Sequence, residues 1–168
     1  MFRHVLAIVA LPVTVTALVP VWIARSRGVG LVAPASTSEV LLWLAGGGCL
    51  GVGLALFLVS LQWFATVGHG TLAPWDPPRR LVVEGPYRSV RNPMISGVLF
   101  VVFGEALALR SVPHAVWAAT FLAINLVYIP LLEEPGLERR FGEAYRRYRQ
   151  HVPRFLPQRR PWRDDERR

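Results

Sequence analysis

Long apolar intervals separated by charged residues dominate the pattern of this chain. A transmembrane helix needs about 20 apolar residues, and three intervals are long enough: residues 4–24, 40–65 and 111–132. A fourth, residues 93–109, is apolar except for Glu105 and would be about 26 Å long as a helix. The pattern predicts an all-α polytopic membrane protein with about four transmembrane helices, the last two forming a hairpin. Glu105 lies toward the far leaflet, and we expect it to pair with Arg110 or to reach the outer interface.

The first interval follows a short basic N-terminus, an arrangement that is also typical of a secretory signal. Its apolar stretch is too long for such a signal, and no convincing small-residue cleavage site follows around Ile23, Ala24 and Arg25. We therefore expect this segment to be retained as the first span.

Composition and charge agree with a membrane protein. Hydrophobic residues make up 52% of the 168 residues and charged residues 18%, with a mean hydropathy of +0.35. All 19 basic residues are Arg, and the net charge of +8 alone would suggest a nucleic-acid binder. However, 16 of the arginines lie in the N-terminus, residues 66–92 and the C-terminal tail, against 3 in the other two loops. The positive-inside rule then predicts cytoplasmic termini in the cell inner (plasma) membrane, with no nucleic-acid partner.

The second interval is rich in glycine, with Gly46, Gly47, Gly48, Gly51 and Gly53. Gly47 and Gly51 have the four-residue spacing that lets helix backbones approach closely. This spacing fits packing within the chain and a homo-oligomer through this helix equally well. The lone Cys49 nearby permits no intramolecular disulfide, and we expect a small packing residue and no metal site.

Polar residues gather at the predicted cytoplasmic boundary in two stretches, residues 68–95 and 128–157, where we expect the chemistry. The first is dense in Gly and Pro, which predicts a rigid binding loop rather than a helix. The second begins with Glu133 and Glu134 at the end of a span, followed by Pro135. Two adjacent carboxylates at a membrane boundary are costly unless they meet water, Arg or a cationic ligand. Function is therefore favoured for Glu133 over simple solvation of a helix end.

A cytoplasmic amphipathic helix is predicted over about residues 136–150. Its apolar side chains recur at helical spacing: Leu137, Phe141, Tyr145 and Tyr148. Arginines occupy the other side, which is typical of a helix lying on anionic membrane lipids. Membrane lipids are therefore expected partners.

Several motifs follow one another over roughly residues 70–157. They are LVVEGPYRSVRNPM at 81–94, an apolar hairpin, EEP at 133–135, FGEAYRRY at 141–148 and VPR at 152–154. In this combination the chain resembles the isoprenylcysteine carboxyl methyltransferase and phospholipid methyltransferase superfamily. The resemblance implies a multi-span membrane enzyme that uses S-adenosylmethionine in a pocket at its cytoplasmic side.

Carried over position by position, the resemblance implies which residues form the site. Contacts to S-adenosylmethionine are implied for Arg79, Arg80, Leu81, Val82, Tyr87, Asn92, Pro93, Met94, Ile95 and Glu133. Catalytic roles are implied for Arg91, Glu133 and Glu134, and no metal is implied. The aromatic ring of Tyr87 is suited to cover a face of the cofactor.

The substrate class follows from departures from the superfamily pattern. Asn92 and Ile95 stand where the superfamily has His and Tyr, which looks more like its phospholipid N-methyltransferase branch. Ile129 stands where an Arg of carboxyl-methylating enzymes is thought to meet the substrate carboxylate. We therefore expect N-methylation of a phospholipid-type or other lipophilic acceptor, with isoprenylcysteine-type O-methylation as the alternative. His69 is a candidate base for an amine acceptor, although a loop histidine is more often merely solvated.

Two other classes of protein remain open at this point. One is an NADPH-dependent membrane reductase of similar architecture, and the other is a non-catalytic membrane interaction protein. Whichever class is correct, we expect the chain to form a single domain, residues 1–168. Within it we expect a two-span scaffold (1–66), a functional part containing the loop, hairpin and C-terminal helix (67–157) and a basic tail (158–168).

Overall fold

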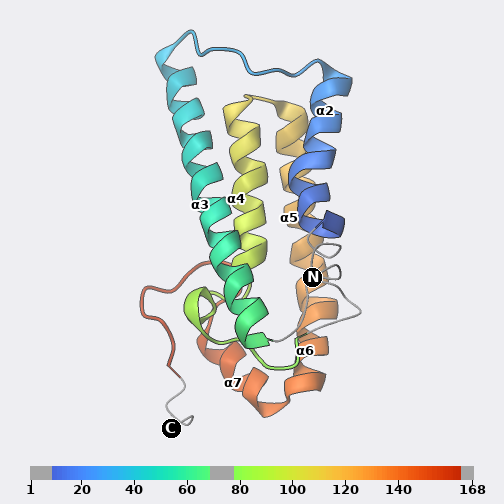
Figure 1. The fold of residues 1–168 in the computed structure, drawn as a ribbon, viewed down its shortest axis with the longest axis vertical. Coiled ribbons are helices and arrows are strands. Elements are labelled where there is room, and N and C mark those ends of the chain that lie inside the picture. Colours follow the sequence, from blue (N-terminus) through green and yellow to red (C-terminus); the bar gives the residue numbers. More distant parts are fainter. Residues whose placement is uncertain (1–8, 69–77, 164–168) are drawn as a thin grey trace.

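The computed structural model describes residues 9–68 and 78–163, and these residues form helices and connecting loops without a strand (Figure 1). The elements are η1 (Val9–Leu18), α2 (Val19–Arg27), α3 (Thr37–Gly68), η2 (Gly85–Arg88), α4 (Pro93–Ala108), α5 (Val112–Tyr128), η3 (Ile129–Glu133), α6 (Glu134–Phe141) and α7 (Glu143–His151). Here η1 and η3 are π-helices, and η2 is a short 3-10 helix. The all-α prediction is confirmed.

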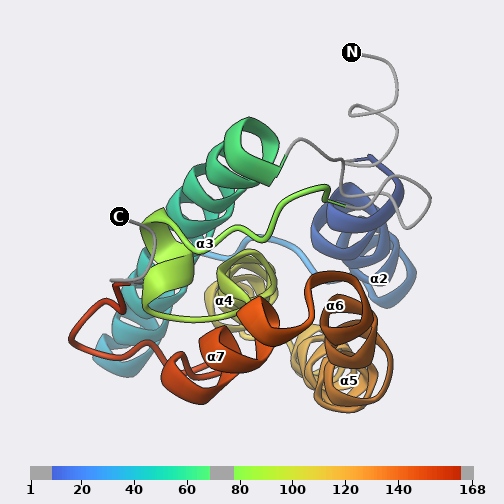
Figure 2. The same cartoon turned by 90° about the horizontal axis from the view of Figure 1, so that it is seen from below.

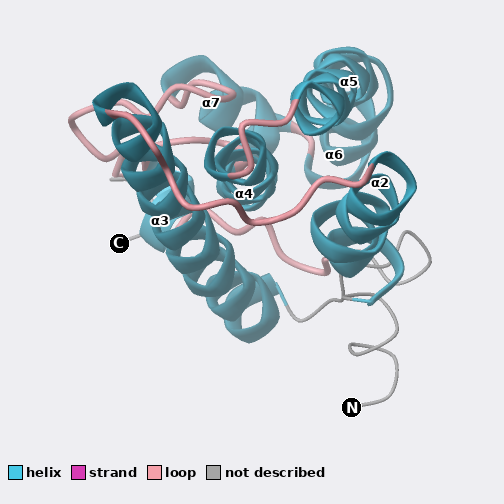
Figure 3. Ribbon diagram, turned by 90° about the horizontal axis from the view of Figure 1, so that it is seen from above, coloured by secondary structure: helices cyan, strands magenta, loops and turns pink. Residues whose placement is uncertain are grey.

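The helices form a lengthwise bundle that is closed at one end. Helices α2, α3, α4 and α5 run beside one another along the long axis (Figure 1). Below them lies the cap, which we define as residues 78–92 and 134–163 and which contains η2, α6 and α7 (Figure 2). Seen from the other end, loops cross the bundle between α2 and α3 and between α4 and α5 (Figure 3).

Two helices in the described part are long and apolar enough to cross a membrane: α3, and the continuous helix Val112–Phe141 made of α5, η3 and α6. Only 17% of the apolar window of each is buried inside the protein. Their apolar side chains therefore face outward, as those of lipid-facing helices do. Helix α4 is apolar but has 16 residues, and η1 and α2 follow each other with 10 and 9 residues.

Helices α3 and α4 touch through their backbones, and glycines make this contact possible. A Cβ added at Gly46 would lie 2.5 Å from the backbone nitrogen of Ala108 and 2.8 Å from the carbonyl oxygen of Gly104. A Cβ added at Gly53 would lie 2.7 Å from the carbonyl oxygen of Gly97. Such close approach allows the dispersion contacts that hold helices together in lipid.

The other glycines of α3 lie on an open face. A Cβ added at Gly47, Gly48 or Gly51 would meet nothing within 4 Å in the described part of the chain. Packing within the chain therefore uses Gly46 and Gly53, and the interpretation of Gly47 and Gly51 as a homo-oligomer contact stays a prediction.

The first helical stretch is attached to α5 through backbone carbonyls. In a π-helix the carbonyl of Val15 would accept a bond from residue 20, but that residue is Pro20 and has no N–H. The Nε1 of Trp117 donates to this carbonyl instead, at 3.0 Å. The Nε2 of His114 lies 3.2 Å from the carbonyl oxygen of Pro20. Side chains of α5 thus bind the carbonyls of a helix that proline interrupts.

Glu105 does not pair with Arg110 among the described residues. The Nη2 of Arg110 donates to the carbonyl oxygen of Val32 at 3.0 Å, in the loop before α3. The Oε2 of Glu105 is buried, and it has no hydrogen-bond partner in the described part. The first of the two expectations for Glu105 is therefore wrong.

The amphipathic C-terminal helix is broken into α6 and α7, so the prediction of one helix over 136–150 is wrong. The break is at Gly142, whose φ of +56° and ψ of −128° leave the helical region and are accessible mainly to glycine. The apolar face is nevertheless confirmed. Tyr145 and Tyr148 are buried with Val83 and Val152, and neighbouring hydrophobic side chains pack against them: Leu81, Leu137, Phe141 and Trp162.

Gly53→Ala should destabilise the protein, because the new methyl group would overlap the backbone of α4. Overpacking of this kind costs about 1–3 kcal/mol. Gly51→Ala is the matched control on the same helix. It meets no neighbour and should be neutral or slightly stabilising, since alanine is about 1 kcal/mol better than glycine inside a helix. Thermal unfolding midpoints of the two purified variants in one detergent check this, and equal midpoints would contradict the glycine contact.

Candidate functional site

Three stretches of the chain meet in the cap: the loop before α4, the end of the long apolar helix, and the tail after α7. Backbone hydrogen bonds join the loop to the tail. The N–H of Arg91 donates to the carbonyl oxygen of Pro153 at 2.8 Å. Further along the tail, the N–H groups of Gln158 and Trp162 donate to the carbonyl oxygens of Ser89 and Arg88, each at 2.9 Å. The tail after α7 is therefore held along residues 88–91, next to the start of α4.

Buried aromatic side chains fill the space between these stretches. The hydroxyl of Tyr148 donates to the carbonyl oxygen of Tyr87 at 2.6 Å. Tyr87 is 8% exposed, and its own hydroxyl reaches the carbonyl oxygen of Ser60 on α3 at 3.5 Å. The ring of Trp63 lies directly against Gly85, where φ is +55° and a side chain would be strained. The loop through η2 is therefore fixed between α3 and α7.

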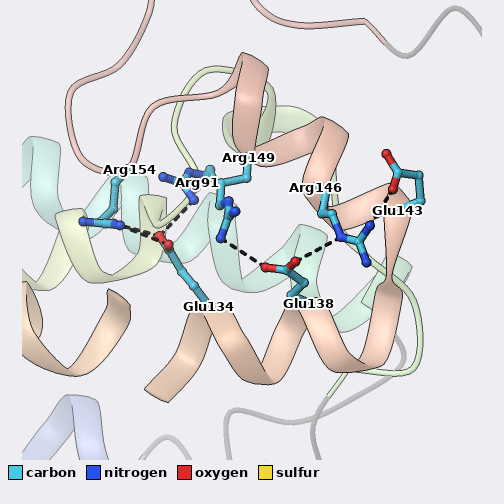
Figure 4. Close-up of polar contacts among 7 residues, drawn as sticks. All are labelled: Arg91, Glu134, Glu138, Glu143, Arg146, Arg149 and Arg154. Carbon is cyan, nitrogen blue, oxygen red and sulfur yellow. Dashed lines mark hydrogen bonds and ion pairs between the residues drawn. The ribbon is translucent and has the colours of Figure 1, made fainter. Parts of the chain in front are cut away.

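Glu134 carries the charge contact that joins all three stretches (Figure 4). Arg154 binds its carboxylate through two hydrogen bonds, Nε to Oε1 at 2.7 Å and Nη2 to Oε2 at 3.0 Å. Arg91 approaches Oε1 at 2.8 Å as an ion pair without hydrogen-bond geometry. Glu134 is 5% exposed and the Arg91 side chain 10%. Both oxygens of Glu134 are therefore occupied by guanidinium groups.

A second charge network spans the break at Gly142 (Figure 4). Glu138 on α6 binds Arg146 at 3.0 Å and Arg149 at 3.1 Å, and Arg146 also binds Glu143 at 2.9 Å. These groups are largely exposed, and such pairs contribute about 0–1 kcal/mol each. They orient α7 relative to α6 but stabilise the cap less than Glu134 does.

Glu133, the neighbour of Glu134, is only partly buried and makes no hydrogen bond or ion pair with the rest of the described chain. It lies close to Tyr87. Burial raises the pKa of the Tyr87 hydroxyl above its usual range, and the charge of Glu133 adds to this shift. The two adjacent glutamates therefore differ: the carboxylate of Glu134 is used within the fold, and that of Glu133 has no such partner among the described residues.

The tyrosine hydroxyls of the cap are not suited to act as bases. Burial raises the pKa of Tyr145 to about 12, and the charge of Glu134 contributes while Arg91 opposes the shift. The pKa of Tyr148 is also above its usual range, because the residue is buried and lies beside Tyr87. All three hydroxyls are protonated at neutral pH, and those of Tyr87 and Tyr148 donate hydrogen bonds to carbonyl oxygens.

The fold brings the predicted site residues to this end of the bundle, but it leaves them in different environments. Asn92 precedes α4 without a side-chain capping bond, and Pro93 begins the helix, with Met94 and Ile95 half-buried in its first turn. The remaining ones lie along the loop, with Arg79 and Arg80 exposed, Leu81 half-buried, and Val82 and Tyr87 buried. His69 lies outside the described residues.

Arg154 was missed by sequence reasoning, although it stands in the VPR motif. Its partner Glu134 is 20 residues away, and α7 has to turn back at Gly142 before the two can meet. The sequence indicated only that a second carboxylate at the membrane boundary needs a cationic partner, because its burial is costly. It did not indicate which arginine would bind Glu134.

An apolar hollow in the described part lies elsewhere. It has a volume of about 330 Å³, is mainly apolar and is lined by α2 and the start of α5, including Trp22, Arg27 and Val116. These residues belong to the loop end of the bundle, opposite the cap (Figure 1). The hollow is therefore separate from the glutamates.

Comparison with known proteins gives one finding. Residues 43–144, more than half of the chain, match the family model described as phospholipid methyltransferase. Neither a curated protein nor a solved structure matches. The matched range runs from α3 into the start of α7, so it includes both glutamates but not Arg154.

Glu134→Gln should destabilise the cap and release the tail. Removing one member of a buried ion pair costs about 3–5 kcal/mol, and we expect the lower end because a third of Arg154 is exposed, at 32%. Glu143→Gln is the matched control, since its pair with Arg146 is exposed and worth at most about 1 kcal/mol. The readouts are the thermal unfolding midpoint and the rate of trypsin cleavage after Arg154. Equal behaviour of the two variants would contradict the role given to Glu134.

Proposed function

Because this chain belongs to the phospholipid methyltransferase family, we propose that it transfers a methyl group from S-adenosylmethionine to the amine of a membrane phospholipid. Membership in this family favours a methyltransferase over the nicotinamide-dependent reductase and over the non-catalytic interaction protein. The apolar outward-facing surfaces of α3 and α5 support action within a membrane.

The observation that carries the proposal is the unequal environment of the glutamate pair. Glu134 is saturated by Arg91 and Arg154, whereas Glu133 has no ion pair or hydrogen bond among the described residues. A carboxylate at the end of an apolar helix is costly unless water, Arg or a cationic ligand meets it, and in the described part of the chain Glu133 has no Arg. S-adenosylmethionine carries ribose hydroxyls, an ammonium and a sulfonium, and each of these groups suits a carboxylate. The donor chemistry of the described residues therefore fits this cofactor.

S-adenosylmethionine, when bound, supplies an electrophilic methyl group. The task of the chain is then to hold the acceptor nitrogen in line with that group and to exclude water, and orientation of this kind is worth about 7–11 kcal/mol. Glu133 would hold the cofactor, and the first turn of α4 after Asn92 would contribute polar backbone groups. Glu134 would act indirectly, by fixing Arg91 and the tail beside this turn.

We propose that the chain crosses the inner membrane four times with the cap in the cytoplasm. Helix α4 has 16 residues, about 24 Å, and close contact with α3 would carry it through the bilayer. In the described part, Arg25, Arg27 and Arg110 belong to the loop end and the other arginines to the cap. The positive-inside rule supports a cytoplasmic cap.

An amine acceptor is favoured over a carboxylate. A carboxylate entering a low-dielectric site needs a cation to offset its desolvation. Ile129 is completely buried and offers none, and Arg91, the nearest basic residue in the loop, already pairs with Glu134. At the position matched to the carboxylate-binding Arg, the isoprenylcysteine alternative therefore lacks a partner for its reacting group.

Glu133→Gln should weaken the binding of S-adenosylhomocysteine by roughly 10- to 150-fold, because a charge-assisted hydrogen bond is worth about 1.5–3 kcal/mol. Glu138→Gln, which alters a half-buried glutamate of α6 that already pairs with Arg146 and Arg149, should leave the affinity unchanged. Thermal shift of the wild-type protein with S-adenosylhomocysteine and with NADPH gives the reference. Stabilisation by NADPH alone would contradict the methyltransferase, and unchanged affinity in a folded Glu133→Gln variant would remove this residue from the site.

Phosphatidylethanolamine should accept a labelled methyl group from S-adenosylmethionine, and a farnesylated cysteine analogue should not. The physical reason is the missing cation at Ile129. Purified protein is assayed with each acceptor side by side, and the labelled lipid is identified. Methyl ester formed on the analogue alone would show that the carboxyl-methylating alternative is correct.

A further inference from the structure

The arginines of the cap differ in their partners. Four of them are paired with carboxylates: Arg91, Arg146, Arg149 and Arg154. Seven others are exposed and have no carboxylate partner in the described part of the chain. Three lie in the tail, at Arg159, Arg160 and Arg163, and we call the remaining four the unpaired arginines: Arg79, Arg80, Arg139 and Arg140. A set of exposed positive charges without counter-charges is suited to an anion.

A hydrogen bond brings the unpaired arginines of the loop and of α6 together. The Nη1 of Arg140 donates to the carbonyl oxygen of Pro78 at 3.2 Å, directly before Arg79. The N–H groups of Arg79 and Arg80 bond to the carbonyl oxygen of Gly68, at 2.8 and 3.4 Å. The loop pair is thereby fixed at the end of α3 and beside α6. The tail after α7 runs on the other side of the cap from α6 (Figure 2).

Their height along the bundle matches the headgroup layer of a bilayer. The exposed apolar surface of the helix Val112–Phe141 ends at Leu131 and Leu132, which are 67% and 62% exposed. Arg139 and Arg140 follow seven and eight residues later, about 10–12 Å along the helix. Side chains on a helix lean toward its N-terminus, which here is the direction of the membrane. Glu133 lies between the apolar edge and these arginines.

We propose that the unpaired arginines bind the phosphate of the acceptor phospholipid, an inference that rests on the proposed function. Guanidinium groups match phosphate oxygens in geometry and charge. A phospholipid lying along the exposed apolar surface of α5 and η3 brings its phosphate to the height of Arg139 and Arg140. Its headgroup amine then lies within the cap, on the same side as Glu133 at the end of the apolar helix.

The test compares two double variants of the full chain, R139Q/R140Q and R79Q/R80Q, with R146Q/R149Q as the matched control. The control removes the same charge from the same end of the molecule, but from arginines that already pair with Glu138. In mixed micelles the KM for phosphatidylethanolamine should rise about 10-fold in the first two variants. In R139Q/R140Q, which alters no residue implied in cofactor binding, the kcat and the affinity for S-adenosylhomocysteine should not change.

Three outcomes would overturn the proposal. An equal rise in KM in the control would show a general effect of surface charge. An unchanged KM in R139Q/R140Q would remove these residues from substrate binding. A loss of S-adenosylhomocysteine affinity in R79Q/R80Q would assign the loop pair to the cofactor instead.

A binding measurement separates this inference from the proposed function. Native mass spectrometry of the full chain counts bound phosphatidylethanolamine and bound diacylglycerol, which lacks the phosphate. The wild-type protein should prefer the phospholipid, R139Q/R140Q should lose the preference, and inorganic phosphate should compete poorly. A preference that depends on the arginines without any methyl transfer would refute the function alone. Methyl transfer without such a preference, or displacement by inorganic phosphate, would refute the inference alone.

Discussion

Glu134 lies where the loop before α4, the end of the long apolar helix and the C-terminal tail meet, and its carboxylate binds a guanidinium from two of these parts. Arg91 comes from the loop and Arg154 from the tail. A buried carboxylate without partners would be strongly unfavourable at this position. Once it is paired, the tail lies along residues 88–91, and the cap closes over Tyr145 and Tyr148.

The helix bundle and the cap are held together by different interactions. Between α3 and α4, glycines allow the backbones to touch. Close packing is needed there because the hydrophobic effect does not drive helices together in lipid. In the cap, where water is present, aromatic burial and buried ion pairs take over. The adjacent glutamates stand at this change of environment, and this explains why one of them serves the fold while the other remains accessible.

Much of this arrangement follows from the sequence, since apolar intervals and arginine counts depend on composition along the chain. The all-α class, the limits of α4, the start of α5, and the apolar face of Tyr145 and Tyr148 were predictable for that reason. Properties that depend on a neighbour in space were not. Gly46 and Gly47 differ by one position, which is about 100° around a helix, and only the location of α4 decides which is buried. The break at Gly142 and the pairing of Arg154 likewise depend on how the cap closes.

The contact between α3 and α4 also determines from which side a lipid can approach. Where the backbone atoms of two helices touch, as at Gly53 and Gly97, no side chains stand between them that could move aside. An acyl chain therefore has no passage through that side of the bundle, and the helices behave there as one wall. In the proposed function, a lipid would have to reach Glu133 from another side of the bundle, so that the wall gives the protein a front and a back within the membrane plane.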